Sequence, residues 1–179
     1  MKIKDLSSVF DPSDIEWRAQ QTGVSAAGKP WLLAIPYINN RAIQQRLDDV
    51  CGAENWANTY APAPNGNGTL CGISVLISDR WVTKHDGAEN TDIEPIKGGL
   101  SNSMKRAAVQ WGIGRYLYQL EAAFADCRVI SGRRDCLDSE NYAYIKPKQG
   151  NPVHCAWKPP VLPMWAQPHV DIDSYLDAI

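Results

Sequence analysis

The sequence predicts an α+β fold in which an antiparallel β-meander carries a long helix across one face, a β-β-β-α core. Residues 56–90 contain three strand-length segments separated by very short turns, and strands joined in this way must be antiparallel. Residues 97–121 follow with the apolar periodicity of a helix. The chain of 179 residues is long enough for one domain with a substantial core. A short N-terminal helix and an irregular C-terminal segment rich in proline and tryptophan complete the prediction.

Three elements are expected before the meander. Residues 12–23 are predicted to form the short helix, with Pro12 at its start. Residues 31–38 are an apolar segment of strand length. Because proline cannot donate a ladder hydrogen bond, Pro36 places this strand at a sheet edge or interrupts it. Residues 41–52 predict an amphipathic helix that ends at a glycine.

The meander is predicted from turn residues and from alternation. Its first strand covers residues 56–61, and the turn at 64–68 (PNGNG) contains the residues that tight turns require. The second strand covers residues 69–78, and the third returns over 81–90. One face of the second strand carries Cys71, Ile73, Val75 and Ile77. This regular alternation indicates a sheet with one face available for the long helix.

The helix expected over residues 97–121 is apolar on two sides. One stripe contains Leu100, Met104, Ala107, Trp111, Gly114 and Tyr118. The nearly opposite stripe contains Val109, Ile113, Tyr116 and Leu117. A helix of this kind must be covered on both sides, and we expect its own sheet on one side and a neighbouring subunit on the other. Ser101 or Asn102 is expected to cap its first turn.

Basic side chains lie between these two stripes. They are Lys105, Arg106 and Arg115, with Lys97 at the entrance of the helix. Residues 1–96 carry 8 basic and 12 acidic side chains, residues 97–134 carry 7 and 2, and residues 135–179 carry 3 and 6. The net charge is only −2, but a local concentration of positive charge is what attracts a polyanion. The helix is therefore predicted to face an anionic partner.

Several functional classes have no support in the sequence. No apolar segment approaches the ~20 residues that span a bilayer, and the N-terminus lacks a secretion signal, so a cytoplasmic protein without membrane contact is expected. The five cysteines contain no C-x-x-C pair and are predicted to be free thiols. No phosphate-binding loop or dinucleotide fingerprint occurs, so we expect no ATP, no cofactor and no catalytic residues.

Two metal-dependent alternatives and one binding alternative stay open at this point. A zinc site would draw on Cys127, Cys136, His154 or Cys155, and His169, although their spacing matches no established pattern. A metal-dependent nuclease would use the carboxylates of Asp86, Glu89, Asp92 and Glu94. A solvated acidic loop explains the same carboxylates more simply. The third alternative is a protein-interaction domain whose basic helix meets an acidic partner.

Four short motifs occur in an order that is similar to a known family. They are residues 37–43 (YINNRAI), 52–56 (GAENW), 105–107 (KRA) and 111–112 (WG), with helix and meander between them. Each motif is weak alone, but their order over residues 12–121 resembles the Rad52 family of single-strand annealing proteins. The short phage recombinases and their bacterial relatives are the most similar members, since they share a Glu-Trp-Arg start and a Pro- and Trp-rich end.

The resemblance implies a non-catalytic function. Family members form rings or arcs, hold single-stranded DNA in a basic groove and anneal complementary strands without ATP during recombination and repair. By position, the family's DNA-contacting residues correspond to Arg18, Tyr37, Lys97, Lys105 and Arg106. Two departures affect the path of DNA: a third basic position is Val109 here, and a longer glycine-rich stretch adds Lys29. Ser101 and Asn102 are expected to add hydrogen bonds to phosphates.

The resemblance also divides the chain. Residues 1–130 are expected to be the DNA-binding and annealing domain, and residues 131–179 a C-terminal extension with the acidic tail 171–179. The expected partners are single-stranded DNA and further copies of the chain. A single-strand-binding protein and an exonuclease are candidate protein partners, in a bacterial or phage-infected cell.

Overall fold

The computed structural model describes residues 2–64, 66–91, 94–147 and 150–168. The chain forms two compact units. The first unit comprises the described residues of 1–14, 38–118 and 165–179, and the second comprises those of 15–37 and 119–164. Helices and antiparallel sheets occur together, which confirms the α+β class. Among the described residues, no helix is long and apolar enough to cross a membrane.

The first unit begins with two short 3-10 helices and an α-helix. These are η1 (Ile3–Ser7), η2 (Pro12–Asp14) and α1 (Asn40–Cys51). The Asn39 side chain caps α1 by accepting a hydrogen bond from Ala42 N, and Gly52 follows the helix with a φ of 85°. Arg46 of α1 donates to Ser8 O at 2.6 Å, which ties the N-terminal segment to this helix. The predicted helix over 41–52 is confirmed to within one residue.

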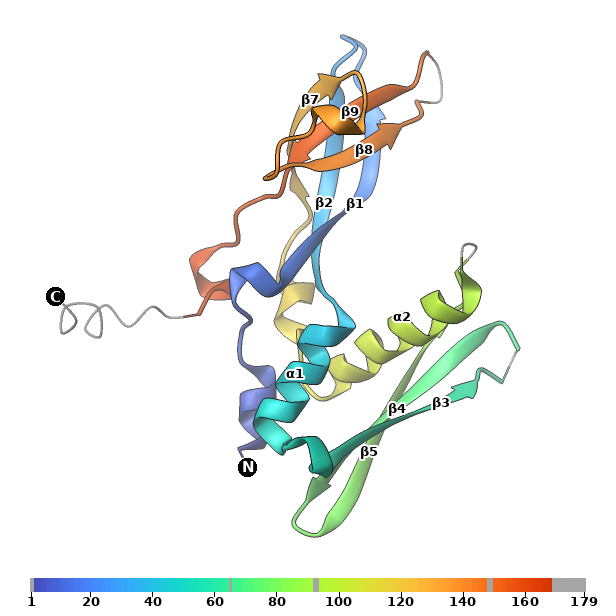
Figure 1. Cartoon of the computed structure of the whole chain (residues 1–179), viewed down its shortest axis with the longest axis vertical. Helices are drawn as coiled ribbons and strands as arrows, with labels where there is room; N and C mark the ends of the chain where they lie inside the picture. The colour runs from blue at the N-terminus through green and yellow to red at the C-terminus, as the bar shows by residue number, and fades with distance from the viewer. Residues whose placement is uncertain (1, 65, 92–93, 148–149, 169–179) are drawn as a thin grey trace, which may run out of the picture. The chain divides into compact units, whose positions relative to one another are not determined.

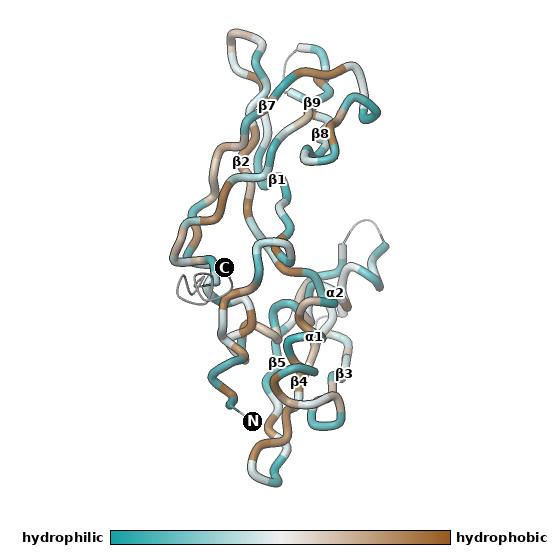
Figure 2. The backbone as a smooth tube through the Cα atoms, turned by 60° about the vertical axis from the view of Figure 1, so that its left-hand side comes forward, coloured by the Kyte–Doolittle hydropathy of each residue, from teal (hydrophilic) through white to brown (hydrophobic). Residues whose placement is uncertain are grey.

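Three consecutive strands form the sheet of the first unit (Figure 1). A one-turn 3-10 helix, η3 (Ala53–Asn55), leads into β3 (Trp56–Pro62), which is followed by β4 (Gly68–Ile77) and β5 (Arg80–Glu89). They pair antiparallel in the order β3-β4-β5. Cys71, Ile73 and Val75 of β4 are fully buried, because they alternate onto the face that α2 (Pro95–Gln110) covers. Figure 2 shows the hydrophobic colouring along β4.

Helix α2 is shorter than the predicted helix. It begins with Pro95 at its first position, where the missing N–H costs nothing, and it ends before Trp111. Gly112 and Gly114 have φ values of 93° and 66°, which a right-handed helix cannot contain. The buried Trp111 Nε1 donates to Ile73 O at 2.9 Å and so ties this turn to β4. The prediction that the helix continues to residue 121 is therefore wrong.

The second apolar stripe is folded into the same unit. Ile113 is fully buried and Leu117, in the 3-10 helix η4 (Arg115–Gln119), is nearly so. Gly114 allows this close packing, since a Cβ there would lie 2.6 Å from Ile38 Cδ1. The expectation that a neighbouring subunit covers Ile113 and Leu117 is wrong, because the turn after α2 returns them to the interior.

The second unit contains two three-stranded sheets. The first has the order β1-β2-β6 and consists of β1 (Ile15–Val24), β2 (Pro30–Ile38, whose last residue belongs to the first unit) and β6 (Ala123–Phe124). The second has the order β7-β9-β8 and consists of β7 (Asp126–Ile130), β8 (Asn141–Ile145) and β9 (Val153–Lys158). Two short 3-10 helices, η5 (Arg133–Asp135) and η6 (Met164–Ala166), complete the element order of the described chain.

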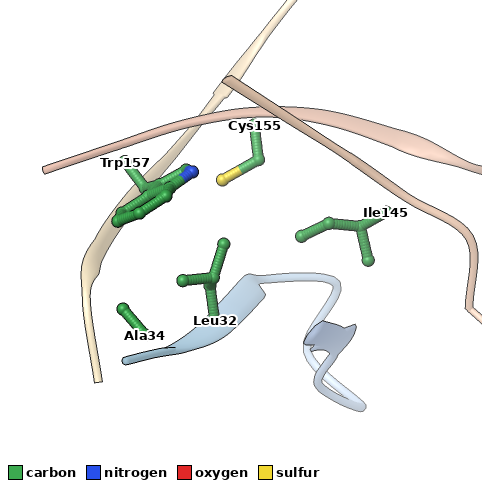
Figure 3. Close-up of a cluster of buried hydrophobic side chains, with 5 residues drawn as sticks. All are labelled: Leu32, Ala34, Ile145, Cys155 and Trp157. Atoms are coloured by element: carbon green, nitrogen blue, oxygen red, sulfur yellow. The ribbon is translucent and has the colours of Figure 1, made fainter. Parts of the chain in front are cut away.

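The core of the second unit joins β2 to the β7-β9-β8 sheet (Figure 3). Figure 3 shows Leu32 and Ala34 of β2 directed toward Ile145 of β8 and toward Cys155 and Trp157 of β9. All five side chains are buried. Residues two apart on a strand share a face, so this core fixes which face of each strand points outward.

The predicted N-terminal helix over residues 12–23 is wrong. The start signals at Pro12 and Ser13 belong to η2, where Asp11 Oδ1 accepts hydrogen bonds from Ser13 N and Oγ at 2.8 and 2.7 Å. The chain then forms β1, in which Ile15 is buried and Trp17 packs against the core of the second unit. Pairing with β2 and this alternation outweigh the local helix signals.

Two further expectations need correction. β2 is the central strand of its sheet, although its pairing with β6 involves only Leu33 and Ala34 and so leaves Pro36 without a partner strand on that side. The proline-rich C-terminal segment is not wholly irregular, because β9 includes Trp157 and buries it.

The five cysteines are free thiols, as predicted. The division of the chain at residue 130, into a DNA-binding domain and a C-terminal extension, stays a prediction.

Candidate nucleic-acid interface

Helix α2 arranges the predicted polar and basic side chains of the first unit in two neighbouring rows. Lys97, Ser101 and Lys105 follow one another at four-residue spacing, and Asn102 and Arg106 form the adjacent row. Residues four apart lie on the same side of a helix, about one turn from each other. At about 100° per residue, Lys97 and Arg106 lie on nearly opposite sides of the helix, so the two rows together span about half of its surface. We call this half of the helix surface the α2 strip.

The N-terminal end of the α2 strip borders an open hollow. Lys97 and Ser101 line it together with Asn40 and Ile96. The Lys97 side chain is 77% exposed, and its Nζ lies 3.0 Å from Glu94 Oε2. An exposed pair of this kind contributes little to stability, so the ammonium group is readily accessible to a competing anion. Ser101 and Asn102 lie inside the helix, so the expectation that either of them caps its first turn is wrong.

Arg106, further along the strip, is held by the neighbouring strand. Its Nε lies 3.0 Å from Asp86 Oδ1 on β5, and its side chain is 53% exposed. Gln110 Nε2 donates to the other oxygen of Asp86 at 3.1 Å. Partial burial opposes ionisation of Asp86, but the hydrogen bonds from Gln110, Gly87 N and Arg106 outweigh it and hold the pKa of this carboxyl below its ordinary value. Asp86 therefore stays ionised and pairs with Arg106.

The other predicted contacts lie in the second unit, on the hairpin formed by β1 and β2. Arg18 is exposed on β1, and Tyr37 near the end of β2 donates a hydrogen bond to Glu16 Oε2. Burial raises the pKa of Tyr37 to about 12, the Glu16 carboxylate adds to this, and the Arg18 guanidinium acts in the opposite direction. Lys29 is exposed at the turn of the hairpin, where its N–H donates to Ser25 Oγ at 3.1 Å.

The predicted site residues thus fall into two groups, one in each unit. Five lie on the α2 strip, and Arg18, Lys29 and Tyr37 lie on the β1–β2 hairpin. Pairing of β1 with β2 brings Arg18 and Tyr37 together, since the guanidinium influences the phenol. Their role in DNA binding stays a prediction.

Two basic residues near the strip have structural contacts of their own. Arg115 donates three hydrogen bonds to Val109 O and Gln110 O at the end of α2, at 2.7 to 2.9 Å. It therefore acts as a cap for the helix C-terminus. Lys84 on β5 was not among the predicted residues. Its Nζ donates to Gln110 O at 2.9 Å and lies 4.4 Å from the centroid of the Trp111 ring. The register of β5 against α2 places Lys84 there, and no local motif indicates it.

The carboxylates of the nuclease alternative are only partly described. Asp86 is bonded to Arg106 and Gln110, Glu94 pairs with Lys97, Glu89 ends β5, and Asp92 lies outside the described residues. For the zinc alternative, His154 Nδ1 is hydrogen-bonded to the Tyr142 hydroxyl, and His169 lies outside the described residues. Within the described ranges no group of three or more His, Cys, Asp or Glu side chains is placed to hold a metal ion.

The chain is similar to known proteins over most of its length. Residues 2–131 match the family described as Rad52/22 family double-strand break repair protein. The single-stranded DNA-binding protein DdrA of Deinococcus radiodurans is 31% identical over 139 residues, which cover 70% of this chain and 61% of that protein. The DdrA protein of Deinococcus deserti is 29% identical over 181 residues, covering 94% of this chain and 73% of that protein. The match spans most of the chain and includes both the β1–β2 hairpin and the α2 strip, and the chain belongs to the Rad52/22 family.

Proposed function

We propose that the protein binds single-stranded DNA and anneals complementary strands in recombination and repair, without ATP and without covalent chemistry. The observation that carries the proposal is the α2 strip, which places Lys97, Lys105 and Arg106 in two adjacent rows along one helix. Family membership and the names of the two DdrA relatives support it. An annealing protein must hold phosphates and leave base edges free for pairing, and a strip of cations meets that need.

The ion pairs of the strip suit reversible binding. Lys97 and Arg106 rest on Glu94 and Asp86, and both basic side chains are more than half exposed. A phosphate that replaces these carboxylates forms charge-assisted hydrogen bonds of the same kind. The exchange costs little for the exposed Lys97–Glu94 pair. Asp86 is only 19% exposed, but it keeps its hydrogen bonds from Gln110 and Gly87 N when Arg106 leaves. Arg18 and Tyr37 form a second group of contacts in this proposal.

We further propose that the protein works as an oligomer, in a ring or an arc. The sheet face turned away from α2 supports this, because Leu76 pairs with Trp81 there and Trp81 is 54% exposed. Ser74 and Thr83, whose hydroxyls lie 2.8 Å apart, share the same face. An exposed tryptophan beside a leucine is typical of a surface that a protein partner covers.

The test compares two double variants in a binding assay with a labelled single-stranded oligonucleotide. Lys105→Ala/Arg106→Ala is expected to lower the affinity at least tenfold. The slope of log K against log salt should become less steep by about 1.4, because two phosphate contacts are lost at ~0.7 each. The control Lys4→Ala/Arg80→Ala removes the same charge from exposed positions of the first unit and should change little. Unchanged binding in the strip variant would refute the role of the strip.

Two further measurements separate this function from its competitors. Complementary strands mixed with the protein should anneal faster without nucleotide, and electron microscopy should show rings or arcs. Labelled DNA incubated with Mg²⁺ should stay intact, and cleavage would favour the nuclease instead. Failure to bind DNA at low salt would favour the protein-interaction domain.

A further inference from the structure

The outward face of the β7-β9-β8 sheet carries a cluster of aromatic rings. Cys155 and Trp157 of β9 point into the core, so His154 lies on the opposite face. Strand register pairs Tyr144 of β8 with His154, and Tyr142 lies two residues before Tyr144 on the same strand. All three rings therefore share the face turned away from the core.

The three rings are held close together. The ring centroids of Tyr144 and His154 are 4.9 Å apart, and those of Tyr142 and His154 are 5.9 Å apart. The Tyr142 hydroxyl and His154 Nδ1 form a hydrogen bond of 2.7 Å, which fixes the orientation of the histidine. Tyr144 nevertheless keeps 48% of its surface exposed. The exposed Tyr144 ring, held beside the His154 ring, does not fill the core, because the core lies on the other face of the sheet.

Two cations border these rings. The guanidinium of Arg133 lies 5.7 Å from the centroid of the Tyr142 ring, and Nζ of Lys146 lies 5.7 Å from that of Tyr144. Both basic side chains are exposed. Residues 126–158 carry six basic and four acidic side chains, so the segment that forms this sheet is positive.

Two of the nearby acidic side chains have other contacts. Glu140 accepts hydrogen bonds from Arg128 at 2.6 and 2.9 Å and from Leu137 N at 2.9 Å. Asp135 accepts from Ser131 N and Gly132 N at 2.9 and 3.1 Å. Arg133 and Lys146 thus lie over neutral rings, whereas these carboxylates are engaged by Arg128 and by backbone groups.

Aromatic rings on the outer face of a sheet, with cations beside them and Tyr144 exposed, suit unpaired nucleic acid. Each base has a flat face that stacks on tyrosine or histidine, and each phosphate is attracted by arginine or lysine. A duplex does not present its base faces, because they are stacked on one another. An acidic protein partner would use the cations but would leave the rings without a function.

We propose that this face is a second contact for single-stranded DNA, in which Tyr144 and His154 stack on bases and Arg133 and Lys146 contact the adjacent phosphates. The surface rests on the proposed function, since it adds a binding site for the same ligand. It lies beyond residue 131, outside the part of the chain that the family match covers. Unlike the α2 strip, it contacts the bases of the strand as well as its phosphates.

The test uses Tyr144→Ala and two oligonucleotides of equal length, one natural and one in which the central nucleotides are abasic. The variant is expected to bind the natural strand about tenfold more weakly, within the range that stacking contributes per base. It should bind the abasic strand as tightly as the wild-type protein does. Tyr144→Phe keeps the ring and should bind both strands normally.

A second variant tests the cations. Lys146→Ala should weaken binding to both oligonucleotides equally, with a loss that shrinks as salt rises. Far-ultraviolet circular dichroism of each variant checks that the sheet is intact, which is expected because Tyr144 and Lys146 are exposed.

The outcomes separate the two proposals. Equal loss by Tyr144→Ala on both oligonucleotides, or no loss on either, overturns the stacking surface. If binding is then still sensitive to Lys105→Ala/Arg106→Ala, the proposed function stands without this surface. If the wild-type protein binds neither oligonucleotide, the proposed function fails and the second contact fails with it.

Discussion

The α2 strip of the first unit and the ring cluster of the second unit hold their exposed cations in different ways. In the first unit, Lys97 and Arg106 rest on carboxylates 3.0 Å away. In the second unit, Arg133 and Lys146 lie over tyrosine rings at 5.7 Å. A carboxylate competes with a phosphate for the same cation, whereas an aromatic ring remains available to a base when the cation moves to a phosphate. In the proposed function, the α2 strip therefore contacts the backbone of a strand, and the ring cluster contacts its bases as well.

This difference affects how each unit should respond to salt and to substitution. Binding through the α2 strip is ionic and should weaken steadily with salt. Stacking of bases on rings releases no counterions, so this part of the binding adds little to the salt dependence. The three predictions that follow test this comparison, from the largest expected effect to the smallest.

The largest effect is expected from Trp157→Ala, which removes a core side chain of the β7-β9-β8 sheet. This sheet carries Tyr142, Tyr144 and His154 on its outer face. Trp157 is buried in the core of the second unit, and truncation of a buried tryptophan to alanine costs about 3–5 kcal/mol. Urea unfolding followed by circular dichroism would measure the loss. Its Nε1 is buried without a hydrogen-bond partner among the described residues, so Trp157→Phe should cost much less.

Val161→Ala is the control for this prediction, because Val161 is 89% exposed and its truncation should change stability by less than about 0.5 kcal/mol. A loss below about 1 kcal/mol for Trp157→Ala would show that the sheet does not depend on this core. The role assigned to its outward face would then lose its structural basis.

A smaller effect, a gain, is expected from Asp86→Asn in the first unit. Asparagine keeps the shape of the side chain but removes the charge that holds Arg106, so a phosphate no longer competes with an anion. Single-stranded DNA should bind about two- to fivefold more tightly at low salt, which corresponds to the ~0.5–1 kcal/mol of a partly exposed ion pair. Fluorescence anisotropy would measure the change.

Glu89→Gln, at the end of the same strand, removes the same charge at an exposed position. The difference between the two variants isolates the contribution of the pair from that of net charge. Equal affinities would contradict the competition between Asp86 and phosphate.

The smallest effect concerns the pH dependence of Tyr37. Burial first, and the Glu16 carboxylate second, raise the pKa of Tyr37 to about 12. Because its pKa is higher in the folded state, the phenol contributes stability that is complete below pH 10 and is lost as the pH rises toward 12. The stability difference between wild type and Tyr37→Phe should shrink over this interval. An ultraviolet titration that finds no tyrosine ionising later in the wild type than in the variant would disprove the shift.

Elements with strong local signals were predictable from sequence. The cap at Asn39 and the glycine at Gly52 define α1, and alternation along β4 identifies its buried face. The strand β1 was not predictable in the same way, because its local signals favour a helix and only pairing with β2 makes it a strand. The early end of α2 depends on Trp111 reaching Ile73, a contact between distant parts of the chain.

The candidate site likewise has a part that could be predicted from sequence and a part that could not. The spacing of Lys97, Lys105 and Arg106 along a helix follows from sequence alone. The carboxylate partner of Arg106 does not, since Asp86 reaches it only through the register between β5 and α2. The ring cluster was also missed, because it requires β8 and β9 to pair with Tyr144 opposite His154. Motif order identified the family, and packing determined which charges are already engaged.

The free thiols give each unit its own internal reporter. Cys71 in the first unit and Cys155 in the second are both fully buried. Burial raises the pKa of Cys71 to about 11 and, with Cys127 nearby, that of Cys155 to about 12. A thiol-specific reagent therefore modifies either residue only after its surroundings have opened. The kinetics of labelling at these two positions, with and without a bound oligonucleotide, would reveal whether the units open separately and which of them a bound strand keeps closed.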